Sequence, residues 1–193
     1  MTVTLRETIR LLKSDFSKGM EYMQIRRSLG GRIFFCITPS MFGICLYRFS
    51  HFFYEKGYRS LAWLLYLIKE YITGMIILPY SEIGERFFVG HANGTAIAAQ
   101  IGKNATLTHA VSIGGGRGPG DVGGGEGLPV IGDNLFVGAG AKILGPIKIG
   151  NNVTVGAASL VIKDVPDHRV VTGIPAKEIR TSETVEFLRS QKY

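Results

Sequence analysis

The chain has 193 residues, 46% of them hydrophobic, and a formal net charge of +7. This length suggests one domain, or a small domain with an appendage, and the hydrophobic content is sufficient for a core. The charge is uneven, because residues 1–78 carry eleven Lys and Arg against five Asp and Glu. No recognised nucleic-acid-binding motif accompanies this excess, which argues against nucleic acid and leaves a membrane surface or an anionic substrate as partners.

The N-terminus and the cysteines limit the compartment. The N-terminus lacks the charged, apolar and small-residue pattern of a cleavable signal. The uncharged and strongly apolar run at residues 33–47 is short for a membrane span and contains Pro39 and Gly43. Cys36 and Cys45 lie in one apolar stretch without ligand spacing, which is typical of buried thiols in a reducing compartment. We therefore expect a cytoplasmic protein.

The pattern before residue 75 predicts helices. Residues 1–28 read as an amphipathic helix that ends at Gly30 and Gly31. Pro39 suits the first turn of a second helix, which ends at Gly57. The i, i+3, i+4 spacing in this second helix predicts a buried stripe made of Phe42, Cys45, Leu46, Phe49, Phe52 and Phe53.

A third helix is expected from Leu61 to about Ile72, closed by Gly74. It has two apolar faces, one predicted to be buried (Leu61, Leu64, Leu65 and Ile68) and a second formed by Trp63, Tyr66 and Leu67. Two faces need two partners, of which the neighbouring helix is one. We favour a subunit contact for the other, and a membrane interface stays open as the alternative.

From residue 83 onward one spacing organises the sequence. Aliphatic residues recur every six positions, with Thr95 as the exception, and the next residue is usually Gly. The series is Ile83, Val89, Ile101, Leu107, Ile113, Ile131, Val137, Ile143, Ile149, Val155 and Val161. Six residues do not return to one face of an α-helix with about 3.6 residues per turn, so the repeat predicts short strands separated by corners.

This series predicts a fold class that is mainly β. Each aliphatic residue would point inward, and three units would make one triangular coil, giving a parallel β-helix of about four coils. The expected organisation is a helical region at residues 1–75, a β-helix catalytic domain at 76–180 and a terminal cap at 181–193 with a short helix. We expect the chain to leave the prism after Val161.

Residues 114–130 interrupt the series, which then resumes in phase. They are rich in Gly, and Arg117, Asp121 and Glu126 are their only charges. The preserved phase predicts a loop extruded from one corner rather than a domain boundary. A long loop on a rigid scaffold is often functional, with a surface excursion of no function as the alternative.

Five motifs run in order and in phase through most of residues 83–180. They are Gly90-His-Ala-Asn-Gly94, Val111-Ser-Ile-Gly-Gly115, Gly138-Ala-Gly-Ala-Lys-Ile-Leu-Gly145, Lys163-Asp-Val-Pro166 and Gly173-Ile-Pro-Ala176. These motifs resemble the left-handed β-helix (hexapeptide-repeat) acyltransferases, in their serine acetyltransferase-like branch. The helical region more loosely resembles capsule and exopolysaccharide acetyltransferases of the colanic acid type.

The resemblance implies a left-handed coil, acetyl-CoA as co-substrate without a metal, and a homotrimer with sites between adjacent prisms. A dimer of trimers stays open. His91 corresponds to the general base that takes the proton of the acceptor hydroxyl. The implied cofactor-binding residues are Gly114 and Gly115 for the oxyanion, Ala139 and Ala157 beside the pantetheine arm, and Lys163 near a CoA phosphate.

Three residues are candidates for the acceptor side. His109 follows His91 by eighteen positions, one coil, so the two rings should stack about 4.8 Å apart. His109 would bind acceptor or acetyl group, or serve only the structure. Asp121 and Glu126 lie in the extruded loop and would contact the acceptor or orient His91 from a neighbouring subunit.

The chain departs from the serine enzymes on this acceptor side. Their acid before the ladder is absent from Ile76–Pro79, their Asp before the catalytic His is Gly90, and their Arg and His are replaced within Glu126–Pro129. The lost groups would meet the charges of an amino acid, so we expect transfer to a free or lipid-linked sugar hydroxyl in capsule, exopolysaccharide or O-antigen synthesis. Serine O-acetylation, a zinc carbonic anhydrase-like enzyme and a non-enzymatic scaffold are the alternatives.

Overall fold

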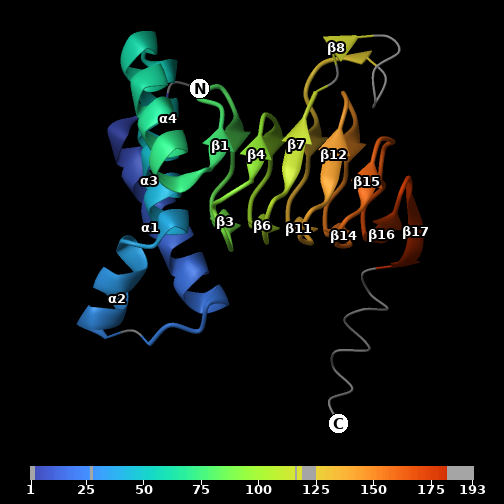
Figure 1. The fold of residues 1–193 in the computed structure, drawn as a ribbon, viewed down its shortest axis with the longest axis horizontal. Helices are drawn as coiled ribbons and strands as arrows, with labels where there is room; N and C mark the ends of the chain where they lie inside the picture. Colours follow the sequence, from blue (N-terminus) through green and yellow to red (C-terminus); the bar gives the residue numbers. More distant parts are fainter. Residues whose placement is uncertain (1–2, 27, 116, 119–124, 182–193) are drawn as a thin grey trace.

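The computed structural model describes residues 3–26, 28–115, 117–118 and 125–181. A group of helices stands at one end of a prism of short strands (Figure 1). The helices are α1 (Leu5–Tyr22), α2 (Leu29–Cys36), α3 (Pro39–Glu55) and α4 (Arg59–Thr73). Within the described residues no single helix is long and apolar enough to cross a bilayer, whereas the pair α2 and α3, bent by 65°, passes that test by length and composition.

Local capping explains most of these boundaries. Pro39 lies in the first turn of α3, and α4 ends at Gly74, whose φ of 65° places it in the left-handed region that favours Gly, as predicted. The predicted break at Gly30 and Gly31 is wrong. Both residues lie inside α2, where the Ser28 hydroxyl accepts a hydrogen bond from the Gly31 amide and so begins a new helix.

The predicted buried stripes of α3 and α4 are also wrong. The apolar residues named for α3 are half-buried or exposed, and the buried positions include Ile44, Tyr47, Arg48 and His51. On α4 the buried residues are Ala62, Lys69 and Thr73. The large side chains of α4 point outward and include Leu61, Trp63, Leu64, Leu67, Ile68, Tyr71 and Ile72. Both helices carry apolar residues on more than one face, so periodicity alone does not identify the inner face.

Three parallel sheets form the faces of the prism, and successive strands enter successive sheets. Sheet A contains β1 (Ile76–Ile77), β4 (Ala96–Ile97), β7 (Ser112–Gly114), β12 (Lys142–Leu144) and β15 (Leu160–Val161). Sheet B contains β2 (Glu82–Ile83), β5 (Gln100–Ile101), β10 (Val130–Ile131) and β13 (Lys148–Ile149). Sheet C contains β3 (Phe88–Val89), β6 (Thr106–Leu107), β11 (Phe136–Val137), β14 (Thr154–Val155), β16 (Arg169–Gly173) and antiparallel β17 (Ala176–Thr181).

The column inside the prism agrees with the repeat. All eleven aliphatic residues of the series are 6% exposed or less. The sheet B residues Ile83, Ile101, Ile131 and Ile149 are register partners along one face. Each coil alone leaves its apolar edges open, so stacking is what buries them.

The two ends of the repeat region differ from expectation. The chain does not leave the prism after Val161, because Val165 bridges to Ile149 and β16 pairs in parallel with β14. The loop at 114–130 contains a short hairpin of β8 (Arg117–Gly118) and β9 (Gly125–Glu126). The predicted helix near residue 183 lies outside the described residues.

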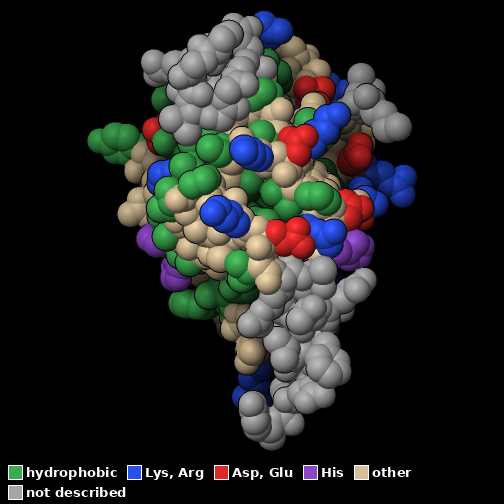
Figure 2. All heavy atoms as spheres, turned by 90° about the vertical axis from the view of Figure 1, so that its right-hand side faces the viewer, with side chains coloured by type: hydrophobic (Ala, Val, Ile, Leu, Met, Phe, Trp, Pro, Cys, Tyr) green, Lys and Arg blue, Asp and Glu red, His purple; other side chains and the backbone are tan. Residues whose placement is uncertain are grey.

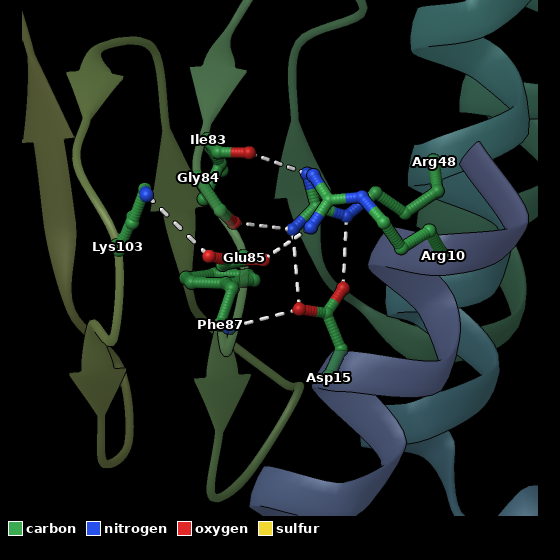
Figure 3. A network of polar contacts seen from close by, with 8 residues as sticks. All are labelled: Arg10, Asp15, Arg48, Ile83, Gly84, Glu85, Phe87 and Lys103. Atoms are coloured by element: carbon green, nitrogen blue, oxygen red, sulfur yellow. Dashed lines mark hydrogen bonds and ion pairs between the residues drawn. The ribbon is translucent and has the colours of Figure 1, made fainter. Parts of the chain in front are cut away.

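A buried ion pair joins the helices to the first strands of the prism (Figure 3). Arg48 of α3 donates from Nε to Asp15 Oδ2 of α1 at 2.8 Å, and its Nη1 and Nη2 donate to the carbonyls of Ile83 and Gly84 at 2.5 and 2.6 Å. Asp15 Oδ1 also accepts from the Phe87 amide at 2.9 Å. The Asp15 and Arg48 side chains are 0% and 2% exposed, so each charge depends on the other partner for neutralisation.

We expect Arg48→Met to lower the free energy of unfolding by about 3–5 kcal/mol, because it leaves the Asp15 carboxylate buried without its counter-charge. Urea unfolding measures the change. Arg86→Met is the matched control, since Arg86 pairs with Glu21 at the surface and should cost less than about 1 kcal/mol. Equal losses in the two variants would contradict a special role for the buried pair.

Lys69 is a second buried cation at this junction. Its Nζ donates to the Ile77 carbonyl of β1 at 2.5 Å and lies 4.8 Å from the centroid of the Tyr66 ring. Burial lowers the pKa of Lys69 to about 7, an effect that the nearby Glu70 charge opposes. The folded protein therefore binds this proton less tightly than the unfolded chain does.

We expect Lys69 to make the free energy of unfolding increase as the pH rises from about 7 to 10.5, because the unfolded chain binds more protons than the folded protein in that window. Lys69→Met should remove this gain. The comparison is the pH dependence of unfolding in wild type and variant. A difference between the two proteins that stays constant across the window would contradict the lowered pKa.

Candidate active site

The exception at Thr95 marks a lengthened corner. Val89 and Ile97 are eight positions apart, whereas the matching step from Leu107 to Ile113 takes six, because Ile97 and not Thr95 is the register partner of Ile113. Two extra residues therefore lie in the corner that carries His91. The Thr95 hydroxyl is turned inward and donates to the His91 carbonyl at 3.3 Å.

The same corner forms a column along the prism. His91, His109, Ala139 and Ala157 each lie two residues after a register-matched rung of sheet C. The His91 and His109 rings are 5.6 Å apart between centroids and meet edge to face at 89°. Ala139 and Ala157 continue this column along the prism and are exposed, and their side chains extend no further than the Cβ atom. The two His residues are aligned one coil apart as predicted, but their rings are perpendicular rather than stacked.

A cavity of about 570 Å³ opens where this column meets the helices. Its walls come from the end of α1, the first turn of α3, the end of α4 and the lengthened corner. The lining residues are Met23, Thr38, Pro39, Ser40, Ile72, Thr73, Gly74, Gly90, His91, Ala92, Asn93 and His109. None of these residues carries a carboxylate or a Lys or Arg cation, so within the described part of the chain the cavity is uncharged apart from its His rings.

The backbone of the lengthened corner is held from two helices. Ser40 of α3 is 5% exposed and donates to the Gly90 carbonyl, one residue before His91, at 3.1 Å. Gly74 at the end of α4 accepts from the Gly94 amide at 3.2 Å. Gly74 has a φ of 65°, and a Cβ there would lie 2.6 Å from Asn93 Oδ1, so a larger residue would strain the backbone and displace the Asn93 side chain. The His91 position therefore depends on the helical region.

Sequence reasoning missed Ser40 and Asn93 as members of the site. Ser40 sits fifty residues before Gly90 and has no motif of its own. Asn93 belongs to a quoted motif, and the interruption of the ladder at Thr95 was the available signal that its corner is enlarged. The other two His residues lie elsewhere, with His51 buried against the Pro79 carbonyl and His168 beside Asn152. Among the described residues no three potential ligands are grouped to hold a metal.

The remaining predicted cofactor residues lie at another corner of the same chain. Gly114 ends β7, and Gly115 approaches the Gly127 carbonyl so closely that a Cβ there would be 1.9 Å from it. Lys163 occupies the equivalent corner after β15 and lines a smaller cavity of about 260 Å³ with Arg169. None of these residues lines the His91 cavity of the same chain.

The end of the prism that carries this smaller cavity is shown in Figure 2, where cationic and acidic side chains are mixed with apolar ones. Arg169 pairs with Glu178 at 3.1 Å. Of the loop residues predicted for the acceptor side, Asp121 lies outside the described residues, and Glu126 is described only as part of the backbone of β9.

Comparison with known proteins places this geometry in a family. Residues 129–163 match the model of the bacterial transferase hexapeptide (six repeats). A serine acetyltransferase of Mycobacterium tuberculosis is 39% identical over 78% of this chain and 65% of its own length, so the chain spans just under two thirds of that relative. A serine acetyltransferase of Bacillus pumilus is 37% identical over 88% of this chain and 76% of its own length.

A solved structure gives the same result. The serine acetyltransferase of Neisseria gonorrhoeae superposes with a TM-score of 0.81 at 29% identity, covering 97% of this chain and 70% of that one. The repeat and the three parallel sheets define a hexapeptide-repeat transferase. The chain belongs to the serine acetyltransferase family. Family membership confirms the predicted enzyme class, an O-acyltransferase that uses acetyl-CoA as co-substrate.

The predicted sugar acceptor and the capsule branch are wrong. The relatives and solved structures compared above are all serine acetyltransferases. The sugar prediction rested on lost charged groups at Ile76, Gly90, Gly127 and Leu128. Of these four positions, Gly90 lines the His91 cavity of the same chain and the other three do not.

We expect Ser40→Ala to lower the turnover number by about tenfold while leaving the KM for acetyl-CoA unchanged, because the Gly90 carbonyl loses the donor that places His91. Ser50→Ala is the matched control. Ser50 is buried on the same helix and donates to the Ala62 carbonyl at 2.7 Å, away from the cavity. Steady-state kinetics and thermal unfolding of both variants separate the effects. Equal kinetic losses in both would show that only stability is involved.

Proposed function

We propose that this chain is an acetyl-CoA-dependent serine O-acetyltransferase with His91 as general base. The main support for this proposal is the cavity in which His91, on a lengthened corner, lies beside His109. The relatives of the chain, which are serine acetyltransferases, support the same function. The cavity is large enough for an amino acid, and its wall combines apolar residues such as Met23 and Ile72 with the polar Ser40 and Asn93. An imidazole suits the task because its ordinary pKa lies near neutral pH.

In this mechanism the neutral His91 imidazole accepts the proton of the serine hydroxyl. The hydroxyl oxygen then attacks the acetyl carbonyl, the C–S bond breaks, and the protonated imidazole gives its proton to the leaving sulfur, which releases CoA without an acyl-enzyme. Backbone N–H groups of Gly114 and Gly115 would bind the oxyanion. The exposed column at Ala139 and Ala157 would hold the pantetheine arm because no longer side chain projects there.

A homotrimer with one active site between each pair of adjacent prisms would bring the catalytic and the cofactor-binding residues together. The His91 column and the corner with Gly115 and Lys163 lie on opposite edges of sheet A, and neither of the two cavities described above contains both. In such a trimer the His corner of one copy faces the Gly corner of the next. The charges of serine would be met by His109 and by the loop residues Asp121 and Glu126, since the described cavity lining holds no carboxylate.

The same proposal includes the finer features of the fold. The coil is left-handed, has about four turns and forms the catalytic domain at residues 76–180, with residues 1–75 as the helical region. The outward stripe of α4 supports a contact between copies, because large apolar side chains are enriched where subunits meet. The protein acts in the cytoplasm, where acetyl-CoA is formed.

With L-serine as acceptor, we expect thiol release from acetyl-CoA at ordinary enzyme efficiency, with kcat/KM above about 10⁴ M⁻¹s⁻¹. L-alanine, which lacks the hydroxyl, is the matched blank. His91→Ala should lower the rate by about 10²–10⁴, the usual contribution of a general base, with CoA binding kept.

Two results would contradict this function in different ways. Serine turnover no faster than the alanine blank, in a protein that still binds CoA, would remove serine as the acceptor. Activity that survives His91→Ala but is lost in His109→Ala would keep the acceptor and assign the base to His109.

A further inference from the structure

The short helix α2 stands apart from the rest of the helical region. Figure 1 shows it at the far end of the helices from the protruding hairpin, extending away from the prism. Phe35 is its one buried residue and packs against Phe16 and Phe88, with ring centroids 5.2 and 6.2 Å apart. This aromatic contact holds α2 to α1 and the first coil while leaving its other faces in contact with water.

The outer face of α2 is apolar. Leu29, Ile33 and Ile37 follow one another at one helical turn, and Phe34 lies beside them. Their exposed fractions are 77%, 57%, 71% and 59%. Phe35 points the opposite way into the core. The four exposed side chains form a surface that we call the α2 face, and it is typical of a helix lying in an interface rather than in a core.

The surroundings of the α2 face are basic. Arg26 and Arg32 are exposed next to it, and neither forms an ion pair with the described residues. In the sequence, residues 22–54 contain no Asp or Glu at all. Apolar side chains flanked by unpaired Arg complement an anionic lipid surface, where the apolar groups enter the acyl boundary and the guanidinium groups contact the headgroup phosphates.

We propose that the α2 face docks this enzyme peripherally on an anionic membrane surface. Leu29, Ile33, Phe34 and Ile37 enter the interface, and Arg26 and Arg32 lie at the level of the headgroups. This docking goes beyond the proposed function and does not depend on which acceptor the enzyme uses.

The charges disfavour a second copy of the chain on the same face. A symmetric contact would place Arg26 and Arg32 of one copy against the same residues of the other, because a twofold interface brings identical patches together. The outward stripe of α4 has no such flanking pair of unpaired Arg, since the Arg59 guanidinium lies 5.7 Å from the centroid of the Tyr54 ring.

Docking would also bring the active-site cavity to the membrane. Met23 lies just before α2, and Thr38 and Pro39 lie just after it, and all three line the cavity that contains His91. The segments that flank α2 in the chain therefore form part of the cavity wall. Acceptor and cofactor would reach a docked enzyme along the edge of the bilayer.

The test is flotation of the full-length protein with vesicles. Wild type should float with vesicles of phosphatidylglycerol and phosphatidylcholine at low salt, and much less with pure phosphatidylcholine. Ile33→Ser/Phe34→Ser should weaken binding by about tenfold or more, because two large side chains no longer leave water. The matched control is Leu64→Ser/Leu67→Ser on α4, whose residues are exposed to similar extents, 52% and 58%, and which should bind as wild type does.

A second variant tests the contribution of the basic residues to membrane binding. Arg26→Gln/Arg32→Gln should lose the preference for phosphatidylglycerol, and wild type should be released toward about 1 M salt, where the screening length falls to about 3 Å. Absence of flotation at low salt, equal binding to neutral vesicles, or an equal loss in the α4 control would each overturn the proposal. A change of mass in light scattering for Ile33→Ser/Phe34→Ser, without wild-type flotation, would identify the α2 face as a contact between copies.

Discussion

The Asp15–Arg48 ion pair is the constraint on which the assembly of helices and prism depends. Both side chains are removed from water, so neither charge is tolerated without the other. Arg48 also donates to the Ile83 and Gly84 carbonyls, and Asp15 accepts from the Phe87 amide. These contacts join α1, α3 and the first coil. If one of the three parts were displaced, a buried charge would lose its partner.

Polar contacts, rather than the apolar stripes, determine the position of the helices relative to the active-site corner. Lys69 holds the Ile77 carbonyl, Ser40 holds the Gly90 carbonyl, and Gly74 receives the Gly94 amide. Each is directional, and together they fix the corner of His91 more narrowly than apolar burial does, because hydrophobic contact has no preferred direction. The apolar faces of α2 and α4 are left free for other surfaces.

The regular and irregular parts of the prism have different uses. Regular six-residue steps build a column in which the interior rungs have a register partner on each side. The chemistry lies where a step is irregular, at the eight-residue step between Val89 and Ile97 that carries His91. The next step, from Ile97 to Ile101, takes only four residues, so the wider corner is compensated and the later rungs keep their phase.

Much of the prism was determined by the sequence alone. Inward rungs, corner glycines and the vertical alignment of His91 with His109 follow from a local repeat, since each unit obeys the same steric rule as the last. The acceptor was wrongly inferred because the loss of single charged side chains was taken to exclude an amino acid, whereas the relatives that share this fold are serine acetyltransferases.

Tertiary structure decided the rest. It selected Ile44, Tyr47 and Arg48 as the inner face of α3, and it brought Ser40 to the Gly90 carbonyl across fifty positions. A helix with apolar residues all round satisfies its own backbone whichever face is buried, so its sequence does not choose between faces. The buried face of α3 is the one from which Arg48 reaches Asp15. Because Asp15 lies thirty-three positions before Arg48 in the chain, this contact exists only in the folded structure.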